Sequence, residues 1–337
     1  MKIHTRGASS STFPKKSYRI NFYNDKFKKK KNLVIEDFYY DNSFILLSLY
    51  RDPSKIRDNL ATNLWNDISN DFKSFNVNSK YVELFINNEY KGLYIFTEPV
   101  NRKKMNLDKK TSIVIKTSSW RVVNPKDDFS KLKKNYYLGN EIKYPNNKEL
   151  YNKVWITFLN RISNYYNNEI ENNYEIIINT FNINNYIDMV IFNAFTNNVD
   201  SNFIKNLYFY MTDYDSLIYI EPWDLELTFG FTYDCSSFAC GKLIDDADNI
   251  SLPLFTGDIK LDSLIIKRYR VLRKSILTKE YFDKMLDKYL LDLKYASTRD
   301  SSIWYEYNLE DEIERIRKWI YIRLDTMDKE LNDYGKF

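Results

Sequence analysis

Glycine is the residue whose scarcity most restricts what this chain can fold into. Only seven glycines occur among 337 residues, and the sequence contains neither GxxxxGK followed by Ser or Thr nor GxGxxG. Both segments need glycine because the backbone must turn tightly and approach a phosphate closely. The sequence therefore excludes the P-loop fold and the GxGxxG dinucleotide-binding fold. Any phosphate chemistry must rest on Lys, Arg, Asn and carboxylate side chains.

Histidine is rarer still, because His4 is the single histidine of the chain. One imidazole cannot build an HExxH metal site or a Cys2His2 zinc site. A Ser-His-Asp triad would have to use His4, at the very start of the chain. The two cysteines, Cys235 and Cys240, are too few for a four-thiolate metal site. They are either two ordinary thiols or one local disulfide.

The charge balance is mild, with 50 Lys and Arg against 46 Asp and Glu and a formal net charge of +4. Such a balance gives no bulk attraction to nucleic acid or to a membrane surface. No apolar run reaches the ~18 residues that a membrane span needs. The first residues, MKIHTRGASS, lack the apolar region of a signal peptide. We therefore expect no nucleic-acid partner, no membrane span and no signal peptide in this chain.

The strongest local run of charge is KFKKKK at residues 26–31. Such a run is usually a solvated loop, and its functional interpretation is a docking site for an acidic or phosphorylated substrate. A polyanion-binding module is the corresponding hypothesis without enzymatic activity. The low net charge of +4 and the lack of an extended basic stretch argue against it.

Hydrophobic periodicity predicts a first part that is rich in strands. Asp52-Pro53 is a typical helix start, because Asp can cap a helix and Pro is tolerated at its first position. The apolar residues that follow at helical spacing are Ile56, Leu60, Leu64 and Ile68. Strands are predicted at residues 3–6, 18–22, 81–86, 93–97 and 112–115, with the third and fourth joined as a hairpin.

The remainder of the chain is predicted to be mostly helical. Residues 117–147 are polar and irregular, which indicates a long surface loop. Helices are expected from about residue 149 and at 186–195, 261–276, 279–295 and 309–331, with a hairpin of strands at 207–211 and 217–220. This order predicts an α+β fold with a small β-rich part, residues 1–100, and a larger helical part, residues 101–337. It is the two-lobed layout of a protein-kinase-like fold.

Residues 197–230 carry the pattern most indicative of chemistry. Asp200 precedes the predicted hairpin, Asn206 opens it and Asp224 follows it. Phosphoryl transfer needs one carboxylate that orients or deprotonates the attacking hydroxyl. It also needs a second carboxylate and an Asn oxygen that hold Mg²⁺ against the phosphates. The alternative is that the two acids only cap a turn and a loop.

The N-terminal segment supplies complementary positive charge. Lys15 and Lys16 precede a predicted strand, and Arg6-Gly7 opens a turn of small residues. A lysine that enters a strand can reach the α- and β-phosphates, and such a turn lets backbone N–H groups approach them. The alternative is a solvated hairpin with exposed lysines.

Five separate segments together resemble the CotH family of spore-coat-type atypical protein kinases. They extend from residue 3 to about residue 330. In chain order they are RGASSSTFPKKSYRINF, LLSLYRDPSKIRDNLATNLW, YVELFINNEYKGLYIFTEPVNRKKM, PWDLELTFG and RKWIYIRLDTMDKEL. Their number and order make this resemblance far more specific than any single motif.

The resemblance implies an atypical kinase fold and ATP-dependent phosphorylation of serine, or of threonine, with Mg²⁺ or Mn²⁺. The implied acceptors are Ser-rich proteins of the spore-coat or cell-surface type. A location in the spore coat and mother cell, or at the cell surface, follows from the same resemblance. A catalytically silent coat or scaffold component of the same fold is the alternative, although retention of the motif residues argues against it.

The resemblance also assigns roles to individual residues. Lys16 would be the catalytic lysine that pairs with phosphate, and Arg6 would also bind the nucleotide. The helix after Pro53 contains no Glu, so Asp58 is the nearby acid to test as the partner of Lys16. Glu98 and Val100 would lie where a hinge meets adenine. Asp200 would be the catalytic base. The metal ligands would be Asp224, Glu226 and either Asn206 or Asn202.

Overall fold

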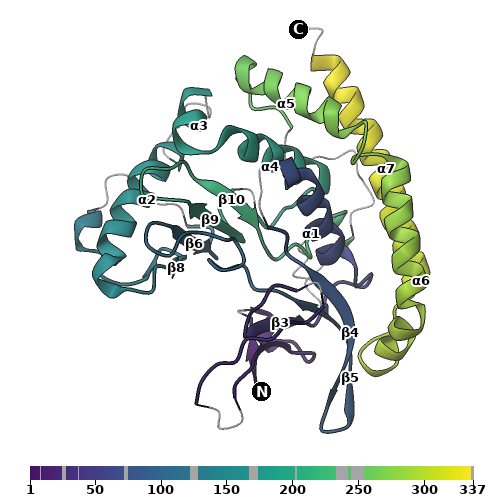
Figure 1. Ribbon diagram of the computed structural model, residues 1–337. Helices are drawn as coiled ribbons and strands as arrows, with labels where there is room; N and C mark the ends of the chain where they lie inside the picture. The colour runs from purple at the N-terminus through teal and green to yellow at the C-terminus, as the bar shows by residue number, and fades with distance from the viewer. Residues whose placement is uncertain are drawn as a thin grey trace.

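The chain forms an α+β fold, as the sequence predicts (Figure 1). The computed structural model describes residues 1–7, 9–24, 28–36, 38–71, 75–121, 128–166, 174–201, 203–232, 242–243 and 254–334. Within these ranges the chain has two five-stranded antiparallel sheets and seven α-helices. Cys235, Cys240, Asn202 and the first two residues of the KFKKKK run lie outside the described residues.

The first sheet has the strand order β1-β2-β3-β5-β4. The strand at its centre, β3, is absent from the sequence prediction. Its sequence, SFILL, is almost entirely buried and lacks the alternation by which a half-buried strand is recognised. The strands of this sheet are β1 (Lys2–Arg6), β2 (Ser17–Asn21), β3 (Ser43–Leu47), β4 (Ser79–Ile86) and β5 (Glu89–Thr97).

The second sheet has the order β10-β9-β6-β8-β7, of which the sequence predicted the β9–β10 hairpin and a strand at residues 112–115 that corresponds to β6. The prediction of a loop over residues 117–147 is wrong in part, because strands β7 and β8 lie within it. Polar side chains on β8 hide its alternation, and Leu138 and Gly139 turn the chain at φ values of 46° and 83°. The strands are β6 (Ile113–Thr117), β7 (Tyr136–Tyr137), β8 (Asn140–Tyr144), β9 (Leu207–Met211) and β10 (Tyr219–Pro222). A separate pair consists of β11 (Phe231–Thr232) and β12 (Lys242–Leu243).

The helices largely follow the predicted apolar spacing, but the first begins later than Pro53. Asp52 does not cap a helix at Pro53. Its carboxylate accepts the Ser54 N–H at 2.9 Å and the Arg57 N–H at 3.0 Å, so a turn precedes the helix. The helices are α1 (Arg57–Ile68), α2 (Tyr151–Tyr166), α3 (Tyr174–Thr180), α4 (Ile183–Thr196), α5 (Ile259–Leu272), α6 (Lys279–Ile303) and α7 (Leu309–Tyr334). None of the described helices is both long and apolar enough to cross a bilayer.

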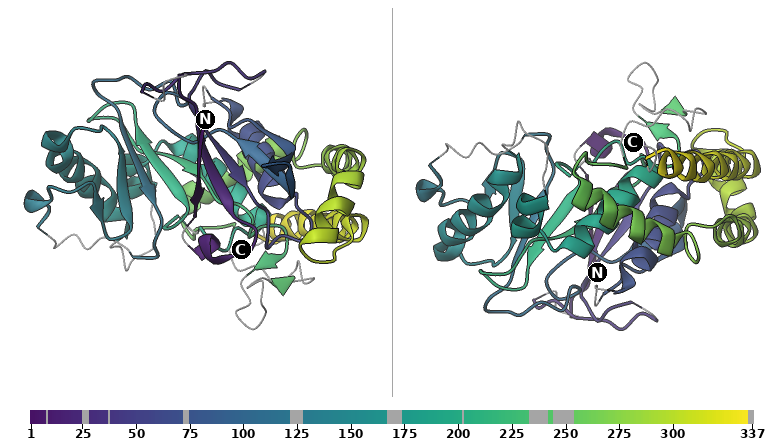
Figure 2. Two further views of the ribbon diagram at one scale, coloured as in Figure 1. Left: turned by 90° about the horizontal axis from the view of Figure 1, so that it is seen from below. Right: turned by 90° about the horizontal axis from the view of Figure 1, so that it is seen from above.

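Helices lie at both ends of the molecule, with the two sheets between them. The long pair α6–α7 covers one end and α2 with α3 the other, in the views from below and above (Figure 2). Helix α4 packs against β10 of the second sheet and against α1, whereas α6 packs against β5 of the first sheet. Helix α1 therefore stands between the first sheet and the helices that cover the second.

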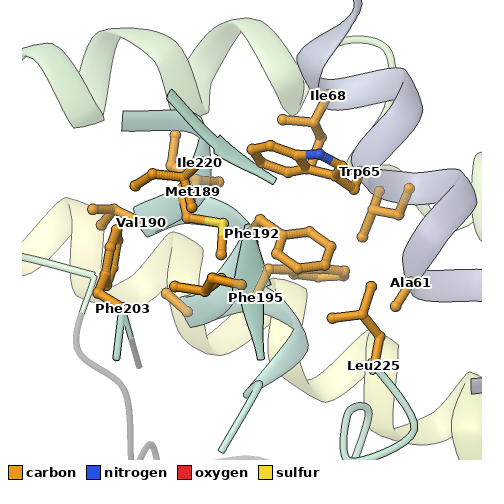
Figure 3. Close-up of a cluster of buried hydrophobic side chains, with 14 of the residues drawn as sticks. Ala61, Trp65, Ile68, Met189, Val190, Phe192, Phe195, Phe203, Ile220 and Leu225 are labelled. Carbon is orange, nitrogen blue, oxygen red and sulfur yellow. The ribbon is translucent and has the colours of Figure 1, made fainter. Parts of the chain in front are cut away.

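One large apolar core extends from α1 through α4 to the second sheet. Figure 3 shows Trp65 of α1 lying over Phe192 of α4, with ring centroids 5.4 Å apart, and Leu225 beside Ala61. Leu225 follows β10, so this core reaches the segment that carries Asp224. The core contains residues from both sides of residue 100. The division of the chain into two lobes, residues 1–100 and 101–337, stays a prediction.

A buried ion pair ties the first sheet to α6. The Lys15 Nζ lies 2.5 Å from an Asp300 carboxylate oxygen, and neither side chain is exposed. The same oxygen accepts the Leu93 N–H at 2.7 Å, and Lys15 also donates to the Leu93 carbonyl at 2.6 Å. Lys55 adds a second ammonium at 4.0 Å from the other carboxylate oxygen. Asp300 therefore neutralises buried charge and completes the backbone bonding of β5.

We expect Asp300→Ala to lower the free energy of unfolding by about 3–5 kcal/mol, because it leaves buried ammonium groups without their carboxylate. Asp292→Ala, on the same helix, is the matched control. Its exposed pair with Lys288 should contribute no more than ~0.5 kcal/mol. Urea unfolding of the three proteins measures the difference. Equal losses in the two variants would contradict a special role for the buried pair.

Candidate active site

A pocket of about 190 Å³ lies where the two sheets meet the start of α1. The first sheet contributes Arg6, at the end of β1, and Ser17, at the start of β2. The second sheet contributes Lys116 and Asn206, and α1 contributes Asp58. The pocket is thus lined by segments from both sheets that are far apart in the sequence.

Strand pairing brings Asn206 and the Trp223-Asp224 segment together. Leu207, the first residue of β9, pairs with Pro222, the last residue of β10. The residues just outside this pair therefore meet, and the Trp223 N–H donates to the Asn206 carbonyl at 2.9 Å. The predicted hairpin thus places Asn206 and Asp224 at one end of the second sheet, as its motif requires.

The Asp224 carboxylate is available to a ligand. Asp224 is exposed at the pocket and has a left-handed backbone conformation, with φ of 64°. No hydrogen bond or ion pair within the described ranges occupies its carboxylate. Non-glycine residues adopt this conformation rarely, and such residues cluster at functional sites.

Two cations flank the Trp223 ring beside Asp224. The Arg6 guanidinium carbon lies 5.6 Å from the centroid of this ring, and the Lys116 Nζ lies 5.8 Å from it. Neither side chain makes a hydrogen bond or ion pair with the residues that the structure describes. Burial lowers the pKa of the Arg6 guanidinium, and it lowers the pKa of Lys116 to about 8, although the charge of Asp224 opposes both shifts. Two half-buried cations that make no hydrogen bond or ion pair with the described residues indicate a site for an anion.

Asp200 lies in the same pocket, held by its own loop. Its two carboxylate oxygens accept from the Lys205 ammonium and from the Asn206 Nδ2, the latter at 2.7 Å. The side chain is buried and bonded through both oxygens, so its orientation is fixed before any ligand binds. Asn206 therefore bridges Asp200 to the segment that carries Asp224.

Glu226, a predicted metal ligand, also lines the pocket but is already paired. The Arg51 Nε donates to a Glu226 oxygen at 2.9 Å. Burial raises the pKa of Glu226 to about 7, against the charge of Arg51 and with the help of Asp224. Glu226 would have to share its carboxylate with Arg51 in order to bind a metal ion.

The family comparison supplies an independent observation on the whole chain. A family model described as CotH kinase protein matches residues 3–327 of 337. The chain belongs to the CotH family. The resemblance carried by the five sequence segments is therefore confirmed. Among curated proteins, no significant match was found.

In this CotH-family chain, three predicted nucleotide-binding residues lie away from the pocket lining. Lys16 donates to the Ser11 carbonyl at 2.9 Å, and it is Lys15 that points into the protein. Glu98 is buried in an ion pair with Lys104 and accepts the Asn78 N–H at 2.9 Å. Val100 is buried in a small apolar cluster. Their contacts with a nucleotide stay predictions, and none of the contacts described here supports them.

Lys116 lines the pocket but was missed by sequence reasoning. It lies in the apolar strand β6, IVIKT, and is directly opposite Tyr208 of β9 in the sheet. A charged residue among apolar strand residues was the available signal. The pairing of β6 with β9 spans about 90 residues of the CotH-family chain, so local pattern could not reveal where Lys116 points.

The donor set of the CotH-family pocket fits a magnesium ion that is shared with phosphate. In the described part of the chain, no three His, Cys, Asp or Glu side chains are grouped to hold a metal ion. The pocket offers the exposed Asp224 carboxylate and the Asn206 amide oxygen. Mg²⁺ is usually held by one or two carboxylates plus substrate phosphates, so a protein cage is not required.

We expect Lys116→Met to weaken binding of ADP, measured without metal, by about 10- to 100-fold. The reason is the loss of one charge-assisted bond to phosphate, worth ~1.5–3 kcal/mol. Titration calorimetry at pH 7 measures the affinity. Lys16→Met is the matched control, because the ammonium of Lys16 donates to Ser11 outside the pocket. An equal loss in the Lys16 variant would mean that Lys16 is the phosphate-binding lysine.

The affinity of the wild-type protein for ADP should also decline as the pH is raised. The pKa of Lys116 in the free protein is about 8, so its charge is present at pH 7 and is lost progressively above pH 8. Lys116→Arg should keep its charge throughout and remove this decline. A decline of the same size in the Arg variant would assign it to another group.

Proposed function

We propose that this CotH-family chain is a protein kinase that transfers the γ-phosphoryl group of ATP to serine or threonine of a protein, with Mg²⁺ or Mn²⁺. The observation that carries the proposal is the meeting in one pocket of the Asp224 carboxylate with two cations, Arg6 and Lys116. Within the described residues, none of the three side chains makes a hydrogen bond or ion pair. Phosphoryl transfer is catalysed almost wholly by positioning and electrostatic stabilisation, and these are the groups that it needs.

Each group has a defined part in this proposal. Arg6 and Lys116 bind phosphate oxygens. Asp224 and Asn206 provide oxygen ligands, and the metal ion, when bound, neutralises charge that develops on the phosphates. Asp200, held by Lys205 and Asn206, orients the acceptor hydroxyl and accepts its proton. Glu226 would be a further metal ligand if its hydrogen bonds with Arg51 were broken.

The pocket volume indicates which part of a nucleotide it encloses. Sites that enclose a drug-sized ligand measure about 300–1,000 Å³. A volume of about 190 Å³ suits a phosphate chain and a metal ion, with the base lying outside. We further propose that the two sheets belong to the two lobes of a kinase-like fold that divide near residue 100, and that the acceptors are Ser-rich proteins of the spore-coat or cell-surface type.

We expect Asp224→Asn to abolish the Mg²⁺ dependence of ATP binding while leaving the fold intact, because the carboxylate is exposed and has no hydrogen-bond or ion-pair partner in the described part of the chain. Calorimetry with and without Mg²⁺ provides the measurement. Asp215→Asn removes the same charge from the turn at the opposite end of the hairpin and should bind like the wild type. An unchanged Mg²⁺-ATP affinity in the Asp224 variant would remove this residue from the site.

We expect Asp200→Asn to bind Mg²⁺-ATP like the wild type but to transfer phosphate at least ~10²-fold more slowly, because it loses the base and keeps the shape. Labelled ATP and a Ser-rich acceptor protein provide the assay. An Asp200 variant as active as the wild type would show that the base is misassigned. A wild-type protein that transfers nothing would instead favour a structural coat component.

A further inference from the structure

We propose that Asp58 of α1 is a positioning residue that fixes Asp224 for metal binding through the backbone of Leu225. The inference rests on the proposed function, since Asp224 is the metal ligand in that proposal. It assigns a part in the site to α1, which lies outside the segment from Asp200 to Asp224 that carries the predicted metal-site pattern.

Asp224 is held by one hydrogen bond on each side of its strained backbone. On the N-terminal side, the Trp223 N–H donates to the Asn206 carbonyl at 2.9 Å. On the C-terminal side, the Leu225 N–H donates to the Asp58 Oδ2 at 3.0 Å. A residue with φ of 64° keeps this conformation only when its surroundings enforce it. The Leu225 bond fixes the peptide that follows Asp224, and the Trp223 bond fixes the residue that precedes it.

The direction of the Asp224 carboxylate depends on these bonds because the side chain has no partner of its own among the described residues. A ligating carboxylate is ordinarily oriented by a hydrogen bond to one of its oxygens. Here that orientation has to come from the backbone. The bond from the Leu225 N–H to Asp58 thus takes the place of a hydrogen bond to the Asp224 carboxylate. Asp58 lies 167 residues before Leu225 in the sequence.

Helix α1 is a rigid platform for Asp58. The neighbouring Arg57 is fully buried and pairs with Asp52 at 2.6 Å. Farther along the helix, the Trp65 indole N–H donates to Glu221 of β10 at 2.9 Å. The Arg57–Asp52 ion pair and the Trp65–Glu221 hydrogen bond hold α1 in place. The bond to Asp58 therefore fixes Leu225, and with it the backbone of Asp224, relative to this helix.

The competing role for Asp58 is direct coordination of the metal ion, and the two roles differ in what they need from the side chain. Positioning needs one acceptor oxygen, which Asn also supplies. Coordination needs the negative charge, which Asn lacks. Asp58→Asn and Asp58→Ala therefore separate the two roles.

The experiment uses the full chain, Mn²⁺ and a non-hydrolysable ATP analogue, with calorimetry for affinity. We expect Asp58→Asn to bind the Mn²⁺-analogue complex within ~3-fold of the wild type and Asp58→Ala to lose ~10- to 100-fold. Asp67→Ala, an exposed position on the same helix, should bind like the wild type. If Asp58→Asn loses as much as Asp58→Ala, Asp58 acts through its charge and the positioning role is overturned. If Asp58→Ala binds like the wild type, the role is likewise overturned.

A second measurement is independent of the proposed kinase function. Hydrogen exchange of the Leu225 amide, with no nucleotide or metal, should be slow in the wild type and in Asp58→Asn and faster in Asp58→Ala. Unchanged exchange in Asp58→Ala would overturn the bond as the means of positioning. If the wild type binds no Mn²⁺-nucleotide, the proposed function fails, and this exchange result still decides whether Asp58 holds the segment.

Discussion

Helix α1 is the element on which both the core and the pocket depend. Trp65 packs on Phe192 of α4 and donates its indole N–H to Glu221 of β10, while Asp58 in the first turn accepts the Leu225 N–H. Protein interiors are packed as densely as organic crystals, so a displacement of this helix cannot be absorbed locally. The packing of the core around α1 therefore also determines the positions of the residues that line the pocket.

Sequence reasoning recovered the elements whose pattern is local. Apolar spacing located α1, α4 and α7 to within a few residues, and the β4–β5 hairpin followed from alternation around a turn. It also located the start of α6, but the prediction ended at residue 295 and the helix extends to Ile303. It missed β3, which is uniformly buried, and β8, whose side chains are polar. In both strands the burial of side chains depends on neighbouring strands that are distant in the sequence. The hydrophobic periodicity within the strand itself therefore does not reveal it.

The same limit applies to the site. Arg6, Asp200, Asn206 and Asp224 were predicted from motifs, and the structure brings all four into one pocket. Lys116 was missed because its place depends on the pairing of β6 with β9. Lys15 and Lys16 show that the sequence also does not reveal which of two adjacent residues is buried. Adjacent residues point to opposite sides, and which lysine turns inward is decided by Asp300, a residue at the other end of the chain.

The Lys15–Asp300 pair joins residues 285 positions apart. Ribosomes add about 5–20 residues per second, so roughly tens of seconds separate the synthesis of the two. During that interval the ammonium has no carboxylate, and the Leu93 N–H lacks the acceptor that it has in the finished protein. The first sheet is thus synthesised before α6 but is completed only after it. A growing chain must keep these strands from pairing with other molecules until α6 leaves the ribosome.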